Sequence, residues 1–175
     1  MYYFLSHLSL IDLCYTSNIT PKLIGDLLVE RKTVSYGDCM VQVLIVHFFG
    51  GTEIFILTAM AFDHYVSICK PLRYVIIMNR TRCNLLLLAA WAGGAVHSFH
   101  FFFFFLMAID FPFCGPNEID HYFCDTFPLL KIACTDTYIP GVLVTDFSGM
   151  VALVTFALLF VSYDIIFFTL NTRST

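Results

Sequence analysis

Two carboxylates lie near the middle of long apolar segments of the chain. Asp12 falls in the segment 2–28 and Glu53 in the segment 39–68. An ionisable side chain inside a membrane span is costly and usually faces the interior of a helix bundle, where it serves a function. If neighbouring helices bring the two carboxylates together, the pair either shares a proton or binds a cation. In the alternative interpretation, each carboxyl is protonated and hydrogen-bonded to a nearby Ser, Thr or Asn side chain.

Histidines and glycines recur at helical spacing in two other apolar stretches. His47, Gly50 and Gly51 share one helix face, and His97 and His100 lie three residues apart further along the chain. Glycines within a membrane helix allow close helix contact or leave a concave space. This pattern indicates a ligand pocket with histidines as polar anchors. Ordinary helix packing explains the same spacing equally well.

The composition indicates the environment in which these residues act. Hydrophobic residues make up 59% and charged residues 13% of the 175 residues, against roughly 45–50% and 25% in soluble domains. The net charge of −4 excludes the basic face of a nucleic-acid binder, and the apolar content excludes a disordered chain. There is no Gly-rich phosphate loop, GxSxG, HExxH or paired CxxC motif, so we expect no enzyme. The sequence predicts an integral membrane protein.

The apolar segments predict an all-α membrane protein with one domain over residues 1–175. A span needs about 20 mostly apolar residues. Four segments meet this length, although the first contains several polar side chains; they are 2–28, 39–68, 85–109 and 139–170.

The charges of the connecting segments predict an orientation in the plasma membrane. The segment 69–82 has four bases and no acid, whereas 110–138 has five acids and one base. The positive-inside rule therefore places 69–82 in the cytoplasm and 110–138 outside. Both ends of the chain are then cytoplasmic. The segment 30–32 is expected outside, although it carries two bases.

Four of the seven cysteines fall on the predicted outer side, where disulfides persist. They are Cys39, at the start of the second span, and Cys114, Cys124 and Cys134 in the acidic segment. Two bridges among four cysteines allow three pairings, and spacing does not choose among them. His121 and Cys124 are also spaced as metal ligands, but a bridge at Cys124 would remove that ligand.

Several motifs along the chain resemble those of one receptor family. The segment Met60–Tyr74, MAFDHYVSICKPLRY, closely resembles the MAYDRYVAICxPLxY signature of olfactory receptors, which are rhodopsin-like G-protein-coupled receptors. Met1–Asp12 resembles the PMYxFLxxLSxxD motif of their second helix. Further similar motifs are Gly37–Cys39 with Gln42, Phe113–Asn117, His121–Asp125, Leu130–Asp136 and Ser162–Tyr163. The resemblance covers essentially the whole chain.

This resemblance implies a fold and a set of structural sites. The four predicted spans correspond to helices two to five of a seven-helix bundle, with a disulfide-stapled outer loop. Cys39 would pair with Cys124, and Cys114 with Cys134. Asp12 and Glu53 match the acidic positions that the family associates with an interior sodium ion, and no other cofactor is expected.

The resemblance also implies a function. Five residues match positions around the pocket for a small volatile odorant: His47, Gly50, Gly51, His97 and Ser98. Asp63, His64 and Tyr65 would meet a heterotrimeric G protein. The ligand would shift the population toward a state that engages a stimulatory G protein, and adenylyl cyclase would then raise cyclic AMP.

The chain departs from the family pattern in two ways. His64 replaces the arginine of the Asp-Arg-Tyr motif, and histidine is shorter and only partly charged near neutral pH, so we expect weaker coupling. Helices one, six and seven of the family have no counterpart in these residues. The alternative function is therefore a truncated, non-signalling membrane remnant of such a receptor.

Overall fold

The described part of the chain is helical. The computed structural model describes residues 2–28, 36–108, 124 and 138–174, and these contain no strand. The elements in chain order are α1 (Tyr2–Leu28), α2 (Tyr36–Cys69), the 3₁₀ turn η1 (Pro71–Arg73), α3 (Tyr74–Ile77), α4 (Arg80–Ala108) and α6 (Tyr138–Ser174).

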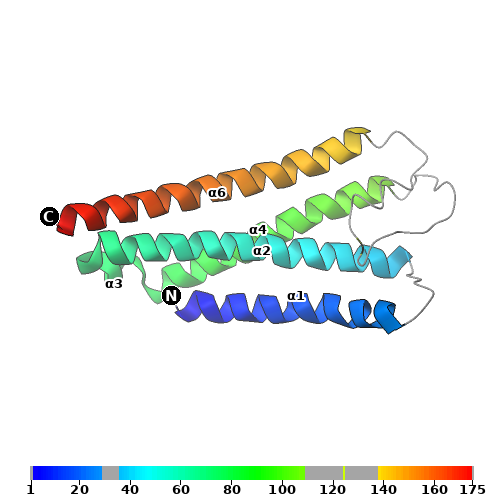
Figure 1. The fold of residues 1–175 in the computed structure, drawn as a ribbon, viewed down its shortest axis with the longest axis horizontal. Helices are drawn as coiled ribbons and strands as arrows, with labels where there is room; N and C mark the ends of the chain where they lie inside the picture. Colours follow the sequence, from blue (N-terminus) through cyan, green and yellow to red (C-terminus); the bar gives the residue numbers. More distant parts are fainter. Residues whose placement is uncertain (1, 29–35, 109–123, 125–137, 175) are drawn as a thin grey trace.

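Helix α2 is central to the arrangement. Figure 1 shows α1, α2, α4 and α6 as long helices with roughly aligned axes, with α1 and α6 on opposite sides of α2 and α4 crossing α2 in this view. Helix α2 packs against α1, α4 and α6, whereas α4 and α6 have little contact with each other. Both ends of the described chain lie at the end of the bundle that carries α3.

Within the described ranges, three helices are long and apolar enough to cross a membrane: Gly37–Cys69, Arg80–Phe103 and Thr145–Thr172. Their large apolar side chains are widely exposed, as in α6, where Phe156, Phe160 and Phe168 are more than half exposed. In a bilayer such side chains face lipid. Helix α1 forms over the predicted residues, but its polar side chains leave it outside this group, so its crossing of the membrane stays a prediction.

The segment between α2 and α4, predicted only as a connection, contains the 3₁₀ turn η1 and the short helix α3. Pro71 begins η1, because proline lacks the N–H that the first position of a helix cannot use. The Asn79 side chain accepts a hydrogen bond of 2.9 Å from the Arg82 backbone N–H and so caps the start of α4. Pro71 and Asn79 therefore favour the starts of η1 and α4, and α4 begins only a short distance along the chain after α2 ends.

Helices α2 and α4 meet at glycines. A Cβ on Gly94 would overlap the Thr52 side chain and lie 2.9 Å from the Phe48 carbonyl oxygen, and a Cβ on Gly93 would lie 2.8 Å from the Phe55 ring. These positions therefore need glycine because the neighbouring helix occupies the space of a side chain. Around this contact, the buried residues of α1, α2 and α4 form one core: Phe4, Ile11, Ile56, Ala59, Val66, Leu87 and Ala90.

Replacing Gly94 with alanine should separate α2 from α4. The added methyl group would meet backbone atoms of α2 rather than a flexible side-chain end, so we expect a loss of about 1–3 kcal/mol in stability. Thermal unfolding in one detergent measures the loss. Gly149→Ala is the matched control, because a Cβ there has no neighbour within 4 Å. Equal melting temperatures for the two variants would contradict the close contact.

Candidate functional site

Two of the predicted ligand residues, His47 and His97, lie together between α2 and α4. The His47 Nδ1 lies 2.8 Å from the Val43 carbonyl oxygen, and the His97 Nδ1 lies 3.4 Å from the His47 carbonyl oxygen. Because a carbonyl only accepts hydrogen bonds, Nδ1–H is the donor in both rings. The two rings stack with their centroids 6.0 Å apart. His97 is buried, so this contact lies inside the bundle.

Aromatic rings extend the histidine pair to α6. Phe147 stacks on His97 with ring centroids 5.7 Å apart and on His100 at 4.1 Å. Phe101 lies 3.6 Å from His47 between ring centroids. We call these five residues, His47, His97, His100, Phe101 and Phe147, the aromatic cluster. The cluster joins α2, α4 and α6. Phe147 was not predicted as a site residue, because nothing in its own segment of the sequence shows which helix it meets.

The other predicted ligand residues surround this cluster in different ways. A Cβ on Gly51 would lie 3.2 Å from His97 Nδ1, so the glycine makes room for the ring. A Cβ on Gly50 would have no neighbour within 4 Å, which shows open space beside that residue. Ser98 Oγ donates a hydrogen bond of 3.1 Å to the Leu44 carbonyl oxygen and so links α4 to α2. Gly51 and His97 therefore meet directly, Gly50 borders open space, and Ser98 is engaged in a contact between helices.

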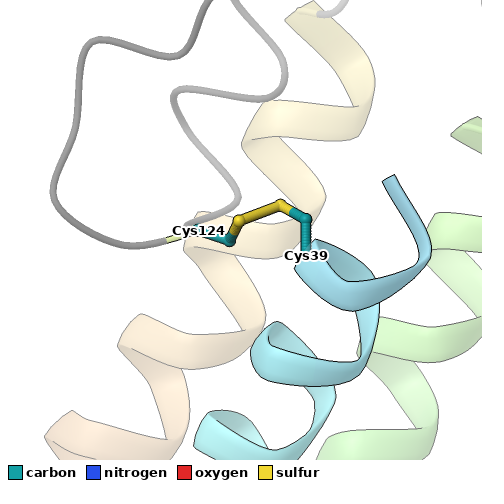
Figure 2. Close-up of a disulfide and its surroundings, with 2 residues drawn as sticks. All are labelled: Cys39 and Cys124. Atoms are coloured by element: carbon teal, nitrogen blue, oxygen red, sulfur yellow. A yellow bond between two sulfur atoms is a disulfide. The ribbon is translucent and has the colours of Figure 1, made fainter. Parts of the chain in front are cut away.

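A disulfide lies at the N-terminal end of α2. Cys39 in the first helical turns pairs with Cys124 (Figure 2), and both cysteines are buried. This confirms the pairing that the resemblance implied. The second implied pair, Cys114 with Cys134, and the histidine His121 lie outside the described residues. One turn further along α2, Gln42 is 6% exposed, and its amide atoms have no hydrogen-bond partner among the described residues.

The two carboxylates predicted as a cation site interact across α1 and α2. Glu53 is half-buried and lies close enough to Asp12 for an electrostatic interaction. Carboxylate oxygens are the donors that hard cations prefer, so the pair fits a sodium ion in its chemistry. In the described part of the chain, no group of three or more His, Cys, Asp or Glu residues is placed to hold a metal.

The predicted coupling residues lie at the opposite end of α2. Asp63 is 2% exposed and accepts a hydrogen bond of 2.9 Å from the Tyr74 hydroxyl of α3. Burial, followed by this bond and the charge of Asp63, raises the pKa of Tyr74 above its ordinary value. His64 and Tyr65 are half-buried, and Tyr65 packs against the core. Tyr74 was visible in the sequence only as the last residue of the Met60–Tyr74 motif.

Comparison with known proteins identifies the family. A family model described as olfactory receptor matches residues 1–174. The chain belongs to the olfactory receptor family. Human olfactory receptors 4S2 and 4X2 are 57% and 52% identical to it over 174 residues, and mouse olfactory receptor 4B13 is 48% identical. These alignments cover 99% of the chain and 55%, 56% and 56% of the relatives, so the chain spans about half the length of these receptors.

Replacing Tyr74 with phenylalanine should destabilise the packing of α3 against the C-terminal end of α2. Removing the hydroxyl takes a hydrogen-bond donor from the buried Asp63, at a cost of about 1–3 kcal/mol. A raised pKa in the folded state means that the tyrosine contributes stability below its unfolded pKa of about 10, and that this contribution is lost as the pH rises through the folded value.

Thermal unfolding between neutral and strongly alkaline pH tests both effects. We expect the parent to lose stability above about pH 10 and the Tyr74→Phe variant to lose less over the same range. Tyr163→Phe is the control, because Tyr163 is 56% exposed on α6. A Tyr74→Phe variant with the parent's stability and pH profile would contradict the Tyr74–Asp63 interaction.

Proposed function

We propose that this segment forms part of an odorant receptor that binds a small volatile ligand and signals through a stimulatory G protein to adenylyl cyclase. The observation that supports a ligand site most strongly is the aromatic cluster, in which side chains of α2, α4 and α6 converge. An apolar space with a few polar groups is typical of a small-molecule site. The receptor would be a multi-pass protein of the plasma membrane with both ends of this segment in the cytoplasm.

The ligand contacts assigned in this proposal are His47, Gly50, Gly51, His97 and Ser98. His97 and His47 supply polar ring atoms, whereas Gly51 keeps space for the His97 ring. Gly50 leaves room for the ligand itself. Ser98 positions α4 against α2 through its bond to the Leu44 carbonyl oxygen. A ligand that contacts these residues would bias the relative positions of α2 and α4, which is the requirement for a population shift.

The inner end of α2 carries the coupling role in this proposal. Asp63, His64 and Tyr65 would contact the G protein, with Asp63 positioned by Tyr74. Asp12 and Glu53 would hold a sodium ion between α1 and α2, and the ion would offset the repulsion between the two carboxylates.

A chimera tests the ligand site. In the chimera, this chain replaces the matching segment of human olfactory receptor 4S2, which is 57% identical to it. The chimera is expressed in cells that contain a stimulatory G protein and a cyclic AMP reporter. A panel of volatile compounds would be screened for responses that the segment confers. His97→Phe keeps a ring but removes the polar nitrogens, so the concentration for half-maximal response should rise about two- to tenfold, the effect of one lost hydrogen bond.

The control for His97→Phe is Val96→Ala, because Val96 is 65% exposed on the same helix. Surface expression is measured in parallel by antibody staining of an N-terminal tag. An unchanged response in His97→Phe at equal expression would remove His97 from the site. A chimera that reaches the cell surface but responds to no compound would favour the non-signalling remnant.

Restoring arginine at His64 should increase the maximal cyclic AMP response of the same chimera. Arginine is longer than histidine and carries a full charge at neutral pH, whereas histidine is only partly charged there. His64→Gln, which has no charge, is the matched control and should lower the response or leave it unchanged. If His64→Arg gives no more cyclic AMP than the parent at equal surface expression, the departure at this position does not limit coupling.

A further inference from the structure

The segment between α2 and α4 is held to the bundle by one of its faces. Met78 is 8% exposed and belongs to the core, and Tyr74 and Ile77 pack against the same core. The Tyr74 hydroxyl also donates to the buried Asp63. These contacts orient α3 firmly, so the side chains on its other face have fixed positions.

The other face of this segment exposes three large apolar side chains. Leu72 is 97%, Val75 80% and Ile76 74% exposed. They recur at spacings of three and one residues over η1 and α3, which is typical of one side of a helix. The segment follows the end of one candidate span at Cys69 and precedes the start of the next at Arg80. These apolar side chains therefore lie where the hydrocarbon of a bilayer gives way to its headgroups.

Exposed bases surround the apolar side chains. Lys70, Arg73, Arg80 and Arg82 are all exposed, and residues 69–82 contain no Asp or Glu. A short segment that combines exposed apolar residues with several bases is typical of the surface of an anionic membrane. The apolar side chains enter the interface, and the bases pair with negative headgroups.

We infer that η1, α3 and the flanking bases form a binding surface for the headgroups of anionic phospholipids, with Leu72, Val75 and Ile76 inserted at the interface. We call these residues, 70–82, the 70–82 surface. The bound lipid would hold α3 in place from the outside, while the Tyr74–Asp63 bond holds the segment from the inside. Anionic lipid would thereby stabilise the position of Asp63 at the inner end of α2. This inference does not depend on an odorant or a G protein.

A tryptophan at position 72 reports on this surface in the full chain reconstituted in lipid nanodiscs. The chain has one native tryptophan, Trp91, which packs against Phe48 and Phe49, and its signal is subtracted with the parent protein. Leu72→Trp is compared in phosphatidylcholine alone and in a mixture with phosphatidylserine. Acrylamide quenching measures access from water, and brominated lipid measures contact with the bilayer.

We expect the tryptophan at position 72 to be shielded from acrylamide and quenched by brominated lipid when phosphatidylserine is present. Replacing two bases, Arg73→Gln with Arg80→Gln, should lower the apparent affinity for phosphatidylserine roughly tenfold or more, because each base near an anionic surface contributes to binding. Both side chains are exposed, so folding should be preserved, and thermal unfolding in detergent checks it.

Leu85→Trp is the matched control. Leu85 is 65% exposed within the candidate span of α4, so a tryptophan there should be shielded equally in both lipid mixtures. Exposure of position 72 to acrylamide in both lipid mixtures would overturn the inference, and the surface would then suit a protein partner. Shielding of position 72 in both mixtures would overturn the assignment to anionic lipid.

Discussion

The close contact of α2 and α4 at Gly94 is the constraint on which the other features of the structure depend. With no Cβ on Gly94, the helix backbones approach until the Thr52 side chain fills the gap. One turn further along α4, this distance places the His97 ring against Gly51 and brings Ser98 Oγ to the Leu44 carbonyl oxygen. A wider separation would break both contacts and move His97 away from His47. The geometry of the aromatic cluster therefore depends on Gly94, which lets the helices approach, and on Gly51, which leaves room for the His97 ring.

Polar side chains inside these helices satisfy most of their hydrogen bonds locally. Thr52, Thr58 and Thr155 each donate to the carbonyl oxygen four residues earlier in their own helix. Such bonds let a hydroxyl lie within a membrane span without a partner on another helix. Ser98 and Ser162 instead donate across to α2 backbone carbonyls, and these bonds fix α4 and α6 against α2. A hydroxyl in these helices thus donates its hydrogen bond either within its own helix or to the backbone of a neighbouring helix, depending on its position.

Hydropathy and local signals predicted much of the fold, because helix formation in a membrane depends on nearby residues. The four long helices follow the predicted apolar segments, and Pro71 and Asn79 lie at the starts of η1 and α4. The partners of Phe147 and Tyr74 could not be predicted in this way. Phe147 meets His97 fifty residues earlier in the chain, and Tyr74 meets a buried carboxylate through a turn whose direction the sequence leaves open. The Cys39–Cys124 bridge could be predicted only in part from the residues themselves. Their spacing allowed three pairings, and only the resemblance to the family selected the one that forms.

Helix α2 connects every feature to which a role has been assigned. Its N-terminal half carries Cys39 and His47, its middle carries Glu53, and its C-terminal end carries Asp63. If this continuous helix of 34 residues moves as a nearly rigid rod, a small displacement at His47 is transmitted along its length. The partners of α2 differ along its length, however: α4 and α6 pack beside it at the aromatic cluster, and α3 packs beside it at Asp63. A ligand among the aromatic rings and a lipid at the 70–82 surface would therefore bias the same rod from its two ends. By linkage, each would then alter the affinity of the chain for the other by the same factor.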